Sequence, residues 1–165
     1  MDANEAPAKL WSMIKDIRFA MLVTEQEDGT LRSRPMATQQ SEFDGDLWFF
    51  TALNAPKVAE VRHHAKVNLS YAEPDDQKYI SVSGTCEVVR DKAKMQELWS
   101  PVYKAWFPNG IEDPNVGLLK VHVTNAEYWD SPNGKMVQLI GYLKAVATGE
   151  HYKASEDEHK KVDMK

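Results

Sequence analysis

The feature that most constrains the fold of this chain is a series of at least six short strand patterns separated by turn signals. Asp28-Gly29 and Asp44-Gly45, which lie between such patterns, are dipeptides typical of hairpin turns. Short antiparallel strands with few helices predict a mainly β (β-rich α+β) fold, a closed or partly closed barrel. The strands are expected at Phe19–Thr24, Leu31–Met36, Asp46–Thr51, Ala65–Ala72, Tyr79–Arg90, Leu118–Ala126 and Tyr128–Trp129.

Helical patterns fill the intervals, and residues 103–114 are expected to be irregular. A chain of 165 residues is long enough for one domain with a substantial core, and no linker divides it. We therefore expect a single domain over residues 1–149, followed by a charged and largely disordered tail over residues 150–165. Helices are expected over roughly Ala6–Asp16, after Asn54 and Pro56, over Lys92–Trp99 and over Lys135–Ala147.

Composition excludes several classes of function. A net charge of −5 and a pI of about 5.5 argue against a nucleic-acid binder that neutralises phosphates. Cys86 is the only cysteine, so neither an intrachain disulfide nor a cysteine-based zinc site is expected, and no metal site is predicted. The first residues are acidic where a signal peptide is basic, and no apolar stretch is long enough for a membrane span. These features predict a cytoplasmic protein that does not associate with membranes.

A strand, a short loop and a helix follow one another between Asp46 and Val61. Asn54 is a good N-cap, and Pro56 fits the first turn of a helix, where its missing N–H costs nothing. Lys57 then lies in that first turn, the unfavourable end of the helix dipole for a cation. An anion such as phosphate bound to the free N–H groups would explain the lysine. A solvated surface lysine is the alternative, and this segment alone does not decide between them.

Two arginines on the strand Leu31–Met36 bear on the same question. Alternation places Arg32 and Arg34 on one face of that strand, where they could form with Lys57 a cationic pocket for a phosphomonoester. Charges that protect an exposed edge strand from aggregation are the alternative interpretation, and both remain open. Pro35 removes a ladder donor, so this strand is expected at an edge or at a bulge.

Several segments in this order resemble the FMN-binding split-barrel flavoproteins related to pyridoxamine 5′-phosphate oxidase, most closely their general-stress-protein branch. The resemblance covers nearly all of residues 10–149. It is carried by Arg32-Ser33-Arg34-Pro35-Met36, Leu47-Trp48-Phe49-Phe50-Thr51 with Pro56-Lys57, Tyr79-Ile80-Ser81-Val82-Ser83-Gly84, Leu98-Trp99-Ser100-Pro101 with Lys104-Ala105-Trp106-Phe107-Pro108, and Glu127-Tyr128-Trp129-Asp130.

The resemblance implies a six-stranded antiparallel split barrel with flanking helices. It also implies a homodimer with a flavin in each of two clefts at the subunit interface. The cofactor is expected to be FMN, with FAD as the alternative; some relatives bind haem or a deazaflavin instead. By position, Arg32 and Lys57 would hold the flavin phosphate. The ring would lie along the strand Arg34-Pro35-Met36 and against Phe50 and Thr51, and Ser33 of the same strand is a further candidate cofactor-binding residue.

Three further aromatic residues are candidate cofactor-binding residues. Tyr79 stands where relatives often place a glutamine that reaches the flavin. Trp106 and Trp129 are candidate contributions from the partner subunit, although tryptophans in a small domain are more often part of the core.

The sequence also departs from the oxidases of this family. True pyridoxamine phosphate oxidases carry an arginine- and histidine-containing motif near the C-terminus that recognises the substrate phosphate, whereas this chain has Val137-Gln138-Leu139-Ile140-Gly141-Tyr142-Leu143-Lys144. Vitamin B6 oxidation is therefore not expected. A flavin carries redox chemistry itself, so an oxidoreductase without a nameable catalytic residue remains one interpretation. A non-catalytic flavin carrier or sensor, or an interaction module, is the other.

Overall fold

The computed structural model describes residues 6–38, 40, 42–130 and 159–163 of the chain. The helix expected over residues 135–147 lies outside them. No helix among the described residues is both long enough and apolar enough to cross a membrane. The elements are α1 (Ala6–Ile14), β1 (Phe19–Glu25), β2 (Leu31–Ala37), β3 (Asp46–Ala52), α2 (Pro56–His63), β4 (Lys66–Glu73), η1 (Pro74–Asp76), β5 (Lys78–Val89), α3 (Lys92–Leu98), η2 (Pro101–Ala105), β6 (Val116–Asp130) and β7 (His159–Asp163).

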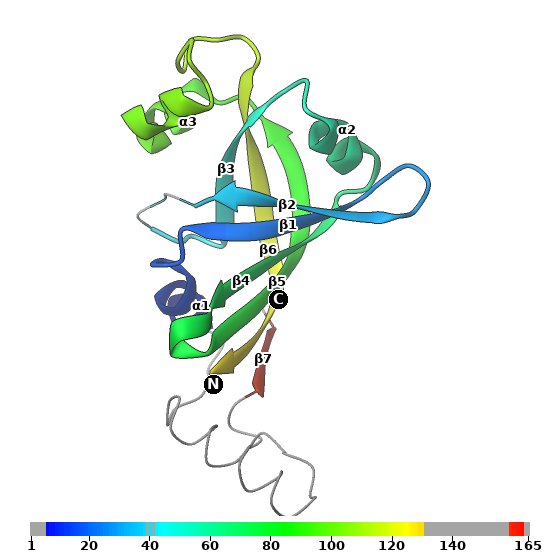
Figure 1. Cartoon of the computed structure of the whole chain (residues 1–165), viewed down its shortest axis with the longest axis vertical. Coiled ribbons are helices and arrows are strands. Elements are labelled where there is room, and N and C mark those ends of the chain that lie inside the picture. The colour runs from blue at the N-terminus through cyan, green and yellow to red at the C-terminus, as the bar shows by residue number, and fades with distance from the viewer. Residues whose placement is uncertain (1–5, 39, 41, 131–158, 164–165) are drawn as a thin grey trace, which may run out of the picture.

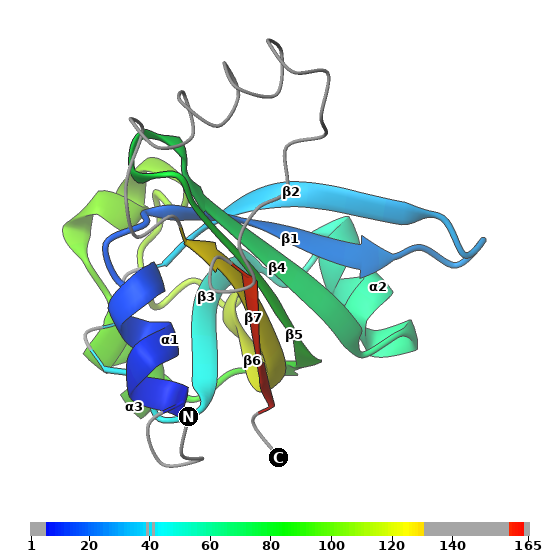
Figure 2. The same ribbon diagram turned by 90° about the horizontal axis from the view of Figure 1, so that it is seen from below.

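Six of these strands form one curled antiparallel sheet in the order β2-β1-β4-β5-β6-β3 (Figures 1 and 2). This confirms the predicted six-stranded antiparallel split barrel. Strand β7 pairs with residues 125–129 of β6, beyond the stretch of β6 that pairs with β3. The tail was predicted to be largely disordered, but the only part of it that is described, His159–Asp163, forms this strand.

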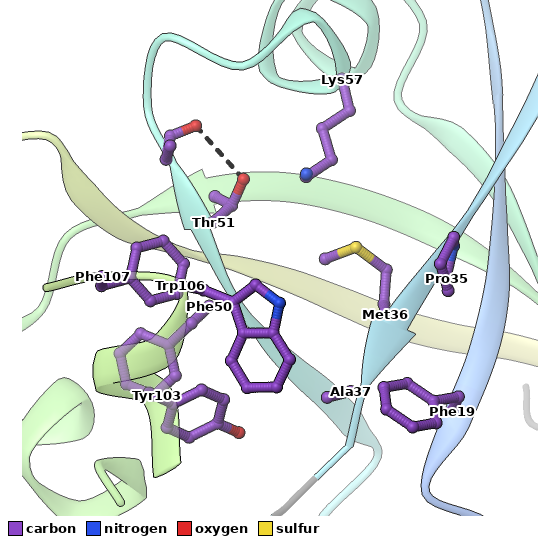
Figure 3. A pocket seen from close by; sticks show the side chains of 11 residues that line it. Phe19, Pro35, Met36, Ala37, Phe50, Thr51, Lys57, Tyr103, Trp106 and Phe107 are labelled. Carbon is purple, nitrogen blue, oxygen red and sulfur yellow. Dashed lines mark hydrogen bonds between the residues drawn. The ribbon is translucent and has the colours of Figure 1, made fainter. Parts of the chain in front are cut away.

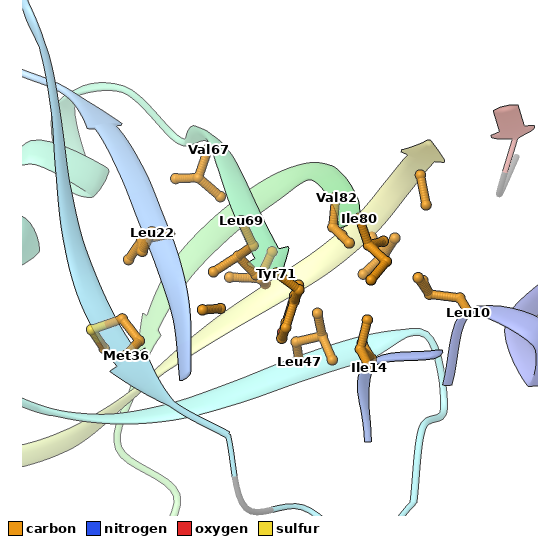
Figure 4. Close-up of a cluster of buried hydrophobic side chains, with 14 of the residues drawn as sticks. Leu10, Ile14, Leu22, Met36, Leu47, Val67, Leu69, Tyr71, Ile80 and Val82 are labelled. Carbon is orange, nitrogen blue, oxygen red and sulfur yellow. The ribbon is translucent and has the colours of Figure 1, made fainter. Parts of the chain in front are cut away.

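The main core fills the inside of the curl. Along β4, Val67, Leu69 and Tyr71 are buried while the residues between them are more exposed, which is the two-residue period of a strand with one face inward. Helix α1 adds Leu10 and Ile14 at helical spacing, and both pack with the same cluster (Figure 4). Burial of one face of every central strand therefore fixes the register of the sheet.

Strands β2 and β3 are the two ends of the sheet, although they follow one another in sequence. The hairpin predicted at Asp44-Gly45 is therefore wrong. Gly45 does adopt the turn conformation, with φ of 106°, but its carbonyl accepts from the N–H of Val123 and β3 pairs with β6. The prediction of an edge position for the Pro35 strand is confirmed, because β2 pairs only with β1 within the described sheet.

Strand β6 is one long element and not the two strands expected from the sequence. Ser83 faces Asn125 and Gly84 faces Val123, so Thr124 is an extra residue at a bulge. The Thr124 hydroxyl donates to the carbonyl of Ser83 at 3.1 Å. The bulge shifts the alternation of buried and exposed residues by one position within this one strand.

Gly84, next to the bulge, is expected to tolerate no side chain. A Cβ at this position would overlap the backbone carbonyl oxygen of His122. Gly84→Ala should therefore lower the free energy of unfolding by about 1–3 kcal/mol, measured by urea denaturation. Gly117→Ala is the control, because its Cβ would lie 2.5 Å from Cδ2 of Leu53, the flexible end of a side chain. A loss as large in the control as in Gly84→Ala would contradict this account.

Candidate functional site

A cleft of about 320 Å³ lies between the two ends of the sheet. Edge strand β2 forms one wall, β3 and the segment after α3 form the other, and α2 closes one end (Figure 3). Its size lies in the range of small-molecule sites. The cleft is lined by Phe19, Pro35, Met36, Ala37, Phe50, Thr51, Ala52, Lys57, Tyr103, Trp106 and Phe107.

One half of the cleft is aromatic, and Phe50 is at its centre. The Phe50 ring lies 4.7 Å from that of Tyr103 and 6.4 Å from that of Phe107, measured between centroids, and Trp99 packs edge-on behind at 5.3 Å. The indole of Trp106 is 54% exposed and extends from the end of η2 toward Met36 and Ala37 (Figure 3). Such a wall offers flat, apolar faces on which a planar ring can stack.

The other end of the cleft is cationic. Lys57 extends from the first turn of α2 into the space between Thr51 and Met36 (Figure 3). The prediction that Asn54 caps this helix is wrong: Ala55 is the N-cap residue and makes no side-chain cap. Asn54 instead exchanges hydrogen bonds with Asn115, at 3.0 and 3.1 Å. Ala55 thus leaves the positive end of the α2 dipole without a side-chain cap beside a lysine, an arrangement that suits an anion.

Behind Lys57, both arginines of β2 turn toward one carboxylate. Arg34 Nη2 lies 2.7 Å from Glu60 Oε2, and Arg32 Nη1 lies 3.7 Å from Glu60 Oε1. The Thr24 hydroxyl donates to Glu60 Oε2 and accepts from Arg34 Nη1, both at 2.5 Å. The prediction that Arg32 and Arg34 share a face is confirmed. Their exposure differs, since 51% of the Arg32 side chain and 15% of the Arg34 side chain are accessible.

The charges in this cluster act on one another. Burial lowers the pKa of Lys57, the nearby charges of Arg34 and Arg32 lower it further, and Glu60 opposes the shift. Burial alone would raise the pKa of Glu60. The hydrogen bond from Thr24, the charge and hydrogen bond of Arg34 and the charge of Arg32 outweigh burial, so the pKa of Glu60 is lowered. Lys57, Arg32, Arg34 and Glu60 therefore form one electrostatic unit.

The structure brings most of the predicted site residues to this cleft. Pro35, Met36, Phe50, Thr51, Lys57 and Trp106 line it, and Arg32 and Arg34 lie at its cationic end. Sequence reasoning missed Phe19, Ala37, Ala52, Tyr103 and Phe107 as lining residues. The aromatic density of the segment before Pro108 was the one signal that could have identified Tyr103 and Phe107.

Three predicted residues lie away from the cleft. Ser33 is an exposed residue of β2 opposite Val23. Tyr79 of β5 and Trp129 of β6 are cross-strand partners on the outer face of the sheet, 45% and 39% exposed. Phe19 and Met21 of β1 are exposed large apolar residues of the same face, at 46% and 40%. We call these four side chains the outer apolar face; Phe19 also lines the cleft.

Cys86 is a buried residue of β5 with a free thiol. Burial, and to a smaller extent the charge of Glu87, raise the pKa of Cys86 to about 12. No group of three or more potential metal ligands gathers within the described part of the chain.

Comparison with known proteins shows what the chain is similar to. Residues 5–153 match the model of the family described as pyridoxamine 5′-phosphate oxidase like. Protein bli-3 of Neurospora crassa is 30% identical over 150 residues, which cover 85% of this chain and 72% of that protein.

Two solved structures share both the fold and part of the sequence. One, from Jannaschia sp. CCS1, is a candidate general stress protein 26 that is 26% identical, with a TM-score of 0.72 over 98% of this chain and 99% of the other. The second is the general stress FMN/FAD binding protein of Xanthomonas citri, which is 29% identical, with a TM-score of 0.68 over 79% of this chain and 92% of the other.

Proposed function

Because the chain belongs to the pyridoxamine 5′-phosphate oxidase-like family, we propose that it is a flavin-binding protein of the general-stress type whose cleft takes FMN. The observation that carries this proposal is the cleft itself, in which an aromatic wall and a cationic end face the same space. FMN has the matching chemistry, a planar ring system at one end and a phosphate at the other. The Xanthomonas citri relative, named as an FMN/FAD binding protein, supports the assignment.

The residues present fit this cofactor. Lys57 and Arg32 would hold the phosphate through charge-assisted hydrogen bonds, helped by the positive N-terminal end of the α2 dipole. Edge strand β2 would present backbone groups near Pro35 and Met36 to the polar edge of the ring, because one side of this strand is unpaired in the described sheet. Phe50, Trp106 and Phe107 would enclose the apolar part. FAD is the alternative ligand.

The proposal includes a homodimer formed through the outer apolar face. Soluble monomers rarely leave several large apolar side chains exposed side by side. Phe19 belongs both to this face and to the cleft, so a second copy seated on the face would lie at the cleft mouth. Tyr79 and Trp129 would then contribute from the partner, the role expected of Trp129 from the sequence. We also propose a cytoplasmic location, on the composition and the single cysteine.

A redox role and a flavin carrier or sensor are the two candidate activities. When bound, a flavin supplies hydride and electron transfer. The chain adds little acid–base chemistry, because among the described lining residues only Lys57 and Tyr103 titrate, and burial raises the pKa of Tyr103 to about 12. The sequence lacks the substrate-phosphate motif of the vitamin B6 oxidases, so we propose that this activity is absent. We favour the carrier or sensor, because none of the described lining residues has a substrate-specific role.

Anaerobic reduction distinguishes these two candidates. For a carrier or sensor we expect dithionite to bleach the flavin absorption while NADH and NADPH leave it nearly unchanged. A reductase would bleach with a nicotinamide at a rate compatible with turnover, commonly about 1–1000 s⁻¹. Stopped-flow absorbance of the flavin-loaded protein measures both rates. Rapid bleaching by either nicotinamide, lost on adding a competing substrate analogue, would overturn the preference for a carrier.

A further inference from the structure

Glu60 is an acidic residue at the cationic end of the cleft. It is 9% exposed, and its carboxylate receives Arg34 and Thr24 on one oxygen and faces Arg32 with the other. It lies one turn along α2 from Lys57 but does not itself line the cleft. A carboxylate is an unfavourable neighbour for a bound phosphate, so its presence among these cations requires an explanation.

The charge balance of the cluster provides one. Arg32, Arg34 and Lys57 carry three positive charges and Glu60 one negative charge, which leaves a net charge of +2. Guanidinium and ammonium groups held this close repel one another, and Arg34 is largely buried. A buried charge without a partner is strongly destabilising. Glu60 therefore holds the cluster together when no phosphate is bound.

We propose that Glu60 is an internal counter-ion that competes with the ligand's phosphate for Arg32 and Arg34, and thereby keeps the flavin exchangeable. It acts through the arginines and is a positioning residue of the phosphate site. The inference rests on the proposed function, since it assumes a phosphate at this end of the cleft. A phosphomonoester brings about −1.5 to −2 charges, similar in size to the net charge that Glu60 leaves on the cluster.

Glu60→Gln tests the competition with little change of shape. An amide oxygen in the place of Oε2 can still accept from Arg34 and Thr24, while the amide nitrogen would face Arg32 and release it toward the ligand. We expect FMN to bind about tenfold more tightly to this variant, while riboflavin, which lacks the phosphate, binds with unchanged affinity. Glu87→Gln is the matched control: Glu87 is 64% exposed on β5, pairs with Lys120 at 3.3 Å, and should change neither affinity.

Titration of both ligands separates the possible failures. If FMN binds no more tightly than riboflavin to the unmodified protein, the phosphate site of the proposed function is wrong. If FMN binds more tightly than riboflavin to the unmodified protein but gains nothing from Glu60→Gln, the counter-ion role alone is wrong. Weaker FMN binding in Glu60→Gln would also overturn it, because the carboxylate would then serve only to orient Arg32.

Thermal unfolding keeps the inference testable where the variant is unstable. Without ligand, Glu60→Gln should unfold at a lower temperature than the unmodified protein, since its cations lose their counter-ion. FMN should recover most of that difference, because its phosphate takes over the charge, and riboflavin should not. A deficit that persists equally with both ligands would show a structural role only and would overturn the inference.

Discussion

Replacing Lys57 and Arg32 together with alanine is expected to weaken FMN binding by about two to four orders of magnitude. Each side chain is proposed to make a charge-assisted hydrogen bond to the phosphate, and such bonds are typically worth about 1.5–3 kcal/mol. Riboflavin should bind with nearly unchanged affinity, because it would stack on the same aromatic wall and has no phosphate. Fluorescence titration of both ligands measures the effect.

A double variant that removes two positive charges elsewhere is the control. Lys92 and Lys104 are exposed and lie outside the lining of the cleft, so Lys92→Ala with Lys104→Ala should leave the FMN affinity nearly unchanged. Equal losses for FMN and riboflavin in the Lys57 and Arg32 variant would show that these residues support the cleft in general and that the phosphate lies elsewhere.

Charges placed on the outer apolar face are expected to separate the proposed dimer and to release the flavin. Met21→Asp with Tyr79→Asp puts two carboxylates on a surface that would otherwise be buried against the partner, where an unpaired charge is strongly unfavourable. Light scattering should give about twice the chain mass of 18.8 kDa for the unmodified protein and a single chain for the variant. Flavin occupancy should fall with it, because the partner is proposed to form part of the cleft mouth.

Val102→Asp is the matched control for this experiment. Val102 is 47% exposed on η2, away from the sheet, so a charge there should change neither mass nor occupancy. An unmodified protein that is a monomer with full flavin occupancy would refute both the interface and the shared cleft.

The strands were predictable because their information is local. Alternation, the Asp28-Gly29 turn and the Pro35 edge position follow from neighbouring residues, and the resemblance added the six-stranded split barrel as the architecture. The partner of β3 was not predictable from local pattern, because it depends on how the whole sheet curls. Asp44-Gly45 has the chemistry of a hairpin turn, yet here it directs the chain to β6 on the far side of the sheet.

In the candidate site too, the residues with a local signal were predictable and those placed by the whole fold were not. Lys57 was identifiable because a cation in the first turn of a helix is locally unfavourable, and the arginines because they share a strand face. Their common partner Glu60 lies 26 residues after Arg34, and no periodicity connects the two. Tyr79 and Trp129 were assigned to the flavin by position, and only the register of β5 and β6 shows that they lie on the outer face.

The central claim is that the cleft between β2 and β3 binds a flavin, and the absorption spectrum of the purified protein tests it most directly. We predict the visible bands of an oxidised flavin, either as isolated or after incubation with FMN and removal of the excess, and we predict that the chromophore released by denaturation has the mass of FMN. A protein that retains no flavin after incubation with FMN, FAD or riboflavin would contradict the claim.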